Sequence, residues 1–315
     1  MEKKIAILDL GTNTFHLLIA RVDTAGYHVV YREKIPVKIG QGGINKGLIT
    51  EAAIARALEA IHSFVAVIKR EKIELVRACA TSAFRNAKNG SDIMERIKNE
   101  TGLEVEIISG NDEAAYIYYG VKEAMNIGEE STLIMDIGGG SVEFIIGNNE
   151  RYFWKRSFEI GAQRLFDLFH RHDPMLTSDI DELNDYFYQE LSPLQEAVKI
   201  FKPTSLIGAS GTFDTLSEID HKRRNIAKEL DSSYFELSIA AYHEIHRELL
   251  SKNKSQRLLI PGMMAMRADM IVVASALLSY ILGLVPFNLI RISRFSLKEG
   301  VLSHFVKSEH IQLTR

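Results

Sequence analysis

Two short turns of the same design carry the residues that could do chemistry. One reads Asp9-Leu10-Gly11-Thr12-Asn13-Thr14, and the other reads Asp136-Ile137-Gly138-Gly139-Gly140-Ser141. Each follows a short apolar run and precedes another, which predicts a strand, an acidic residue, a tight turn and a second strand. Such a turn exposes backbone N–H groups that can hold phosphate oxygens, and glycine lets the backbone approach a ligand closely. We therefore predict that the two turns form a two-sided phosphate clamp.

Three carboxylates accompany these turns. Asp9 and Asp136 each end a strand, and Glu143 follows the second turn. Two like charges about 4 Å apart repel by about 4 kcal/mol at an effective dielectric near 20, so the clamp requires a cation. Oxygen ligands suit Mg²⁺ or Mn²⁺. For Glu143 an exposed strand position is an equally good interpretation.

The alternative interpretation of either turn by itself is an ordinary β-hairpin. Two copies argue against it, because each is followed by a second hairpin signal, at 23–26 and 147–149, and by a third strand, at 27–31 and 151–157. The same group of strands occurring twice points to duplicated lobes.

Composition limits the remaining possibilities. The 315 residues, 46% of them hydrophobic, suffice for one or two domains, and a net charge of −3 gives no reason to expect a nucleic acid partner. Cys79 is the single cysteine, which excludes an internal disulfide and suits the cytoplasm, and we expect an inert, buried thiol. The longest apolar run, 271–285, is shorter than the roughly 20 residues of a membrane span, so we predict a buried helix and no membrane partner.

Between the turns, helices and strands alternate, which indicates a mixed sheet of the α/β class. We expect a connecting loop over 37–47. Helices are expected to begin after Thr50, to cover 92–101, 162–170 and 178–199, and to end at about Met125. Two more are expected to be centred on Ile239 and Ala274, and a last one to begin at Ser296. Strands are expected at 74–80, 105–108, 205–207 and 287–292, with a polar loop at 81–86 and a third Gly-rich turn at 208–212.

Six motifs together resemble the exopolyphosphatase and guanosine pentaphosphate phosphohydrolase family. They are the segments 9–16, 80–89, 108–114, 136–141, 208–212 and 295–302, which occur in the order of the family and span almost the whole chain. Thr12 and Thr14 stand where serine is common, and His16 stands where many members have arginine.

The resemblance implies the two-lobed actin-like (ribonuclease H-like) phosphotransferase fold, with duplicated mixed sheets, flanking helices and an interlobe cleft. On this basis we expect lobe I over 1–125, lobe II over 126–294, and a C-terminal helix over 295–315 that returns to lobe I. The chain looks too short for the helical C-terminal domains of longer members.

Glu113 matches the glutamate that the family uses as catalytic base, and an ionised carboxylate can accept a proton from water. Its alternative is an end-of-helix charge, which the helix dipole favours by about 0.3–1 kcal/mol. Arg85 would hold phosphate oxygens with its guanidinium, its alternative being a surface salt bridge.

The resemblance also adds Ser210, Gly211 and Thr212 as phosphate-binding residues. Arg267 and Lys298 are weaker candidates for the path of a long anion, and solvated surface charge is the default for both. His170 and His172 lack a third spaced ligand, so solvent-exposed helix-end histidines are favoured over a metal site.

These observations predict a cytoplasmic exopolyphosphatase that depends on Mg²⁺ (or Mn²⁺) and releases orthophosphate from inorganic polyphosphate. Guanosine pentaphosphate hydrolysis is the nearest alternative. An ATP-dependent kinase or chaperone of the same fold, and a sensor without turnover, remain open, as does a homodimer.

Overall fold

The computed structural model describes residues 3–23, 26–226 and 232–313. The chain divides into two compact units, the first comprising Met1–Gly120 and Leu297–Arg315, the second Val121–Ser296. The division falls inside helix α4 (Gly110–Ala124) and directly before helix α12 (Leu297–Leu313). The lobe boundaries expected after residues 125 and 294 stay a prediction.

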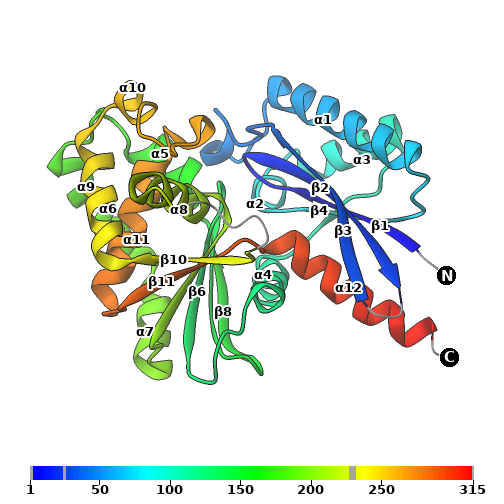
Figure 1. Cartoon of the computed structure of the whole chain (residues 1–315). Helices are drawn as coiled ribbons and strands as arrows, with labels where there is room; N and C mark the ends of the chain where they lie inside the picture. The colour runs from blue at the N-terminus through cyan, green and yellow to red at the C-terminus, as the bar shows by residue number, and fades with distance from the viewer. Residues whose placement is uncertain (1–2, 24–25, 227–231, 314–315) are drawn as a thin grey trace. The chain divides into compact units, whose positions relative to one another are not determined.

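The first unit is built on a five-stranded mixed sheet (Figure 1). Its strands are β1 (Lys3–Leu10), β2 (Thr14–Asp23), β3 (Gly26–Pro36), β4 (Leu75–Ala80) and β5 (Glu106–Ile107), in the order β3-β2-β1-β4-β5. The first three are antiparallel neighbours, whereas β1, β4 and β5 are parallel. The hairpin turn expected at 23–26 includes residues outside the described ranges.

Helices cover both faces of this first sheet. α1 (Glu51–Arg70), capped by the Thr50 side chain as expected, and α3 (Gly90–Thr101) bury their apolar sides against one face. α12 packs on β1 and β2 from the other side (Figure 1). The short α2 (Ser82–Arg85) and a 3₁₀ turn at Ile44–Lys46 complete the unit.

The second unit repeats this arrangement. Its strands are β6 (Thr132–Ile137), β7 (Val142–Gly147), β8 (Tyr152–Phe158), β9 (Ser205–Ala209), β10 (Tyr234–Ser238) and β11 (Leu289–Ser293), in the order β10-β11-β9-β6-β7-β8. Two antiparallel pairings join β6, β7 and β8, and β6, β9 and β11 are parallel. The order is that of the first sheet with β10 added at one edge, so the duplication is confirmed.

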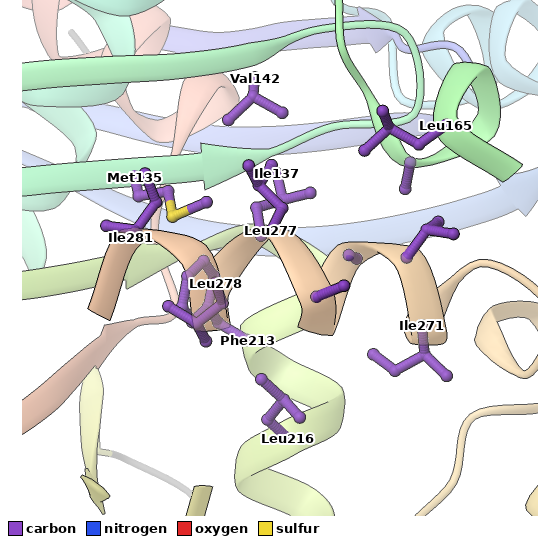
Figure 2. Close-up of a cluster of buried hydrophobic side chains, with 14 of the residues drawn as sticks. Met135, Ile137, Val142, Leu165, Phe213, Leu216, Ile271, Leu277, Leu278 and Ile281 are labelled. Atoms are coloured by element: carbon purple, nitrogen blue, oxygen red, sulfur yellow. The ribbon is translucent and has the colours of Figure 1, made fainter. Parts of the chain in front are cut away.

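The core of the second unit centres on α11 (Ile271–Leu284), which is apolar on nearly every side, as a fully buried helix must be. Figure 2 shows Met135 and Ile137 of β6 pointing toward Ile281 and Leu277 of α11. The other helices of this unit are α5 (Ala162–Phe169), α6 (Thr177–Glu190), α7 (Ser192–Phe201), α8 (Ser210–Arg224), α9 (Ile239–Ser251) and α10 (Lys254–Arg257), with a 3₁₀ turn at Ala265–Arg267.

Three expectations about these elements are wrong. The single helix expected over 178–199 is two helices, because Pro193 lies in the first turn of α7, where a missing N–H costs little. The third Gly-rich turn is the first turn of α8, whose few apolar residues gave little periodic signal. Ile239 begins α9 rather than lying at its centre, since β10 occupies the preceding residues.

Two further expectations concern the single cysteine and the absence of a membrane-spanning helix. Cys79 is a buried free thiol, as predicted, and burial raises its pKa to about 12. Within the described residues, no helix combines the length and the apolar character that crossing a membrane would require.

Candidate active site

Sheet topology places the site residues of the first unit at one edge. Asp9 lies near the carboxyl end of β1, Arg85 follows β4, and Glu113 follows β5. Because these strands are parallel neighbours, their carboxyl ends lie at the same edge of the sheet, where ligands bind in α/β proteins. Cys79, which pairs with Asp9 in register, feels the charges of both Asp9 and Glu113.

The second unit uses the same topology. Asp136 lies near the carboxyl end of β6, Ser210 follows β9, and Ser296 follows β11. Ser210 Oγ donates a hydrogen bond to Asp136 Oδ2 over 2.7 Å, and Ser296 Oγ donates to the same oxygen. Three adjacent parallel strands therefore bring one carboxylate and two hydroxyls together. Sequence reasoning missed Ser296, although its place after a strand matches that of Ser210.

The turn of the first unit is closed by a hydrogen bond from Gly11 N–H to Thr14 O at 3.2 Å. The carbonyl of Thr12 accepts from Gly40 N–H at 3.2 Å, and the carbonyl of Asn13 accepts from two further N–H groups of the loop 37–47. The C=O and N–H of a planar trans peptide point in opposite directions. The N–H groups of Asn13 and Thr14 are therefore aimed away from that loop.

From the sequence, the segment 37–47 was expected to be only a connecting loop, but in the structure it also contacts the first turn. Val37 N–H and Lys38 N–H converge on Asn13 O at 3.0 and 2.9 Å. Lys38 adopts a left-handed backbone with φ 51, which is costly for a residue with a side chain. The loop forms the support on which the first turn rests.

The second turn is closed in the same way, by Gly138 N–H and Ser141 O at 3.1 Å. The carbonyls of its three glycines accept from the start of α5, through the N–H groups of Ala162 at 2.9 Å, Gln163 at 2.8 Å and Gly161 at 3.2 Å. By the same peptide geometry, the N–H groups of Gly139, Gly140 and Ser141 point away from α5. Three consecutive N–H groups aimed alike are a ready anion-binding concavity.

Gly161 was not singled out from the sequence. A Cβ at this position would overlap the backbone of Gly139 and Gly140, so α5 can approach the turn only because this residue is glycine.

Asp136 and Glu143 are direct cross-strand neighbours on β6 and β7, so their side chains lie on the same face of the sheet. Both are buried, and Ser157 Oγ donates to Glu143 Oε1 at 2.7 Å. The interpretation of Glu143 as an exposed strand residue is therefore wrong.

These residues fit a Mg²⁺ ion that keeps water and substrate oxygens as ligands. In the described part of the chain, no group of three or more His, Cys, Asp or Glu side chains could form a complete protein cage. Mg²⁺ is usually held by one or two carboxylates together with phosphates and waters, and the Asp136–Glu143 pair provides two carboxylates. In the other unit, the buried Thr14 Oγ1 lacks a hydrogen-bond partner among the described residues, as expected of a ligand-binding hydroxyl.

Arg85 and Glu113 form an ion pair. Arg85 Nη1 lies 2.9 Å from Glu113 Oε2 and also donates to Ile108 O at 3.1 Å. The side chains are only 18% and 9% exposed, so Arg85 is not the surface salt bridge of the alternative interpretation. The expectation that Arg85 lies in a polar loop is wrong, because Arg85 is the last residue of the short helix α2.

The two acids that begin α4 have different surroundings. Asp112 exchanges hydrogen bonds with Ser109, at 2.6 Å between the side chains and 3.1 Å from Asp112 N–H to Ser109 Oγ. Ser109 Oγ thus caps the helix, and Asp112 is the end-of-helix charge hydrogen-bonded to it, whereas Glu113 faces Arg85. The catalytic role of Glu113 stays a prediction.

At the start of α8, the guanidinium of Arg267 lies against Gly211 so closely that a Cβ there would overlap it. Arg267 is buried and its Nε has no hydrogen-bond partner within the described residues, so solvated surface charge is the wrong interpretation. Burial lowers the pKa of Arg267, and Asp214 and Asp136 act in the opposite direction. Ser210 has a left-handed φ of 70 and Thr212 is buried.

Lys298 is half-buried and lies 3.3 Å from Glu299 Oε2, so it too is not simply a solvated charge. Among the histidines, His172 is exposed as expected and lies 3.0 Å from Asp179. The expectation that His170 is exposed is wrong, because its side chain is only 6% exposed. Burial lowers the pKa of His170.

Duplicated sheets of one strand order, each with an acidic strand end and a Gly-rich turn, define an actin-like fold of the phosphotransferase kind. The model of the Ppx/GppA phosphatase family matches residues 18–309, and the chain belongs to this family. That the two turns share one phosphate stays a prediction.

Solved structures agree with this assignment. An exopolyphosphatase from Cytophaga hutchinsonii is 43% identical, with a TM-score of 0.94, over 97% of this chain and 98% of that one. The Ppx/GppA family member of Aquifex aeolicus is 24% identical, with a TM-score of 0.81, over 98% and 99% of the two chains, and shows the same fold.

Proposed function

We propose that this protein is a metal-dependent exopolyphosphatase that hydrolyses the terminal phosphoanhydride bond of inorganic polyphosphate and releases orthophosphate. The observation that carries the proposal is that successive carbonyls of each turn, Thr12 and Asn13 in one and Gly138 to Gly140 in the other, accept hydrogen bonds from behind, so that the N–H groups within each turn are aimed alike. The 43% identity to the Cytophaga hutchinsonii exopolyphosphatase supports the substrate.

In the proposed reaction, the candidate site residues have different roles. N–H groups of the two turns hold phosphate oxygens, and Arg85 adds a cation whose five N–H donors allow it to bind phosphate while it holds Glu113. Glu113 accepts a proton from the attacking water. Phosphoryl transfer requires mainly positioning and charge stabilisation, which this arrangement supplies.

Asp136 and Glu143, with Asp9 from the first unit, would hold Mg²⁺ or Mn²⁺. Bound there, the ion would neutralise charge on the phosphate oxygens. Guanosine pentaphosphate is the second candidate substrate, because the family takes part of its name from that activity. The single reduced cysteine supports a cytoplasmic location, and a homodimer stays a prediction.

Release of orthophosphate from polyphosphate, guanosine pentaphosphate and ATP, measured side by side with Mg²⁺, tests the proposal. We expect polyphosphate to give the highest kcat/KM and Glu113→Gln to lower kcat by about 10²–10⁴ fold, the usual contribution of general base catalysis. Asp112→Asn, which changes the neighbouring acid that is hydrogen-bonded to Ser109, serves as the matched control. Polyphosphate binding without phosphate release by the wild-type protein would overturn the proposal.

A further inference from the structure

An arginine on α5 reaches back to the second phosphate turn. Arg164 Nε donates to Gly140 O over 2.8 Å, and its Nη2 lies 3.2 Å from Glu159 Oε2. The Arg164 side chain is only 11% exposed, so water competes little for this bond. Gly140 O also accepts from Gly161 N–H and is therefore held twice.

The hydrogen bond from Arg164 to Gly140 O also fixes the direction of the Ser141 N–H group. Gly140 C=O and Ser141 N–H belong to one planar unit, so fixing the carbonyl fixes the direction of the N–H. Three consecutive glycines are the most flexible backbone that a chain can have. A turn made of them keeps one conformation only if contacts from other parts of the chain hold it there.

The first unit has a counterpart on α1. Arg56 Nε donates to Val37 O at 2.7 Å and Nη2 donates to Lys38 O at 3.0 Å. The N–H groups of these same two residues hold Asn13 O, which shares its peptide plane with Thr14 N–H. Arg56 therefore holds the left-handed backbone at Lys38 in the conformation that supports the turn.

We propose that Arg164 and Arg56 are positioning residues that aim the N–H groups of the two turns at the phosphate, an inference that rests on the proposed function. Neither needs to touch the substrate. Arg164 acts through Gly140, and Arg56 acts through the loop over 37–47.

Steady-state kinetics with polyphosphate and Mg²⁺ test both residues. Arg164→Gln and Arg56→Gln are each expected to raise KM and to lower kcat/KM by about tenfold or more, since small misplacements of binding groups have effects of this size. A purely structural loss would lower the active fraction, and with it the apparent kcat, but would leave KM unchanged. Arg164→Lys, with one charged donor for one carbonyl, should recover part of the loss, whereas Arg56→Lys should not, because an ammonium cannot hold two carbonyls in the geometry of the guanidinium.

Exposed arginines on or next to the same two helices provide matched controls. Arg171→Gln removes a guanidinium just beyond α5, and Arg70→Gln removes one at the end of α1. Both should leave KM within twofold of wild type.

A second measurement does not require turnover. In a Glu113→Gln background, inorganic tripolyphosphate with Mg²⁺ should shift the amide NMR signals of Gly139, Gly140 and Ser141, and adding Arg164→Gln should weaken this binding about tenfold. Wild-type protein that releases no phosphate would count against the proposed function, while these signals would still decide the role of Arg164. The inference would be overturned if Arg164→Gln left the KM for polyphosphate unchanged and also left the binding of tripolyphosphate, followed through these amide signals, unchanged.

Discussion

The carboxylate of Glu113 is held by the guanidinium of Arg85, with 2.9 Å between Oε2 and Nη1 and with both side chains largely buried. The two residues come from different elements, α2 and the first turn of α4, and are 28 positions apart in the chain. The ion pair thus holds the proposed base in one orientation beside the cation that we expect to bind phosphate.

Because of this pair, Arg85→Gln should impair both folding and catalysis. Removing one partner of a buried ion pair costs about 3–5 kcal/mol at full burial, and the partial exposure here makes the lower end the better expectation. We expect a lower thermal midpoint and a kcat/KM reduced by at least about 10² fold. In the double variant with Glu113→Gln, the losses should be far from additive, since the residues act as a unit. Additive losses would contradict a shared role.

The carboxylates of the second unit should govern the metal requirement. Asp136→Asn and Glu143→Gln each remove one negative charge, so the Mg²⁺ concentration for half-maximal activity should rise about tenfold or more. Asp181→Asn on the exposed side of α6 is the control and should not change it. A metal titration of phosphate release provides the measurement, and a chelator should abolish activity. An unchanged titration in Asp136→Asn would exclude a ligand role.

Histidine 246 should make stability depend on pH. His246 Nδ1 lies within hydrogen-bond distance of Ser275 Oγ, and burial, with a smaller effect of His243, lowers the pKa of His246 from 6.5 to about 4. The unfolded chain therefore binds this proton at a higher pH than the folded protein does. The free energy of unfolding should decrease by about 3 kcal/mol as the pH falls from 6.5 to about 4, and should then level off.

Thermal unfolding between pH 7 and pH 4 measures this effect. His246→Gln should flatten the fall, whereas the exposed His243→Gln on the same helix should leave most of it in place. A wild-type midpoint that does not decrease over this range would contradict the assignment.

Gly300 should be irreplaceable where α12 crosses α4. A Cβ at Gly300 would overlap the carbonyl of Tyr116, one turn along α4 from Glu113. We expect Gly300→Ala to destabilise the protein by about 1–3 kcal/mol, the cost of overpacking, and to lower kcat because α4 carries the proposed base, Glu113. Gly283→Ala on α11 is the control, since its Cβ would meet nothing within 4 Å and should stabilise slightly. Equal midpoints for the two variants would show that the crossing is not close.

Local sequence patterns were enough for the repeated hairpins, the acidic strand ends and the buried helix α11, because each depends on the spacing of apolar, acidic and glycine residues within a few positions. They failed at α8, where Phe213, Leu216 and Ile219 are the main apolar residues, and at the break between α6 and α7. Weak amphipathic signals of this kind do not distinguish a helix from a loop.

The amino-acid sequence by itself determined which residues are candidates for the chemistry, since Gly138, Asp136 and Glu113 each stand in a short motif. Tertiary structure decided how these residues are held. Arg164 meets Gly140 across 24 positions, Ser296 meets Asp136 across 160, and the loop over 37–47 supports the turn at Thr12 and Asn13. The physical reason is that parallel strands gather their carboxyl ends at one edge, and backbone hydrogen bonds between distant segments leave no periodic trace in a sequence.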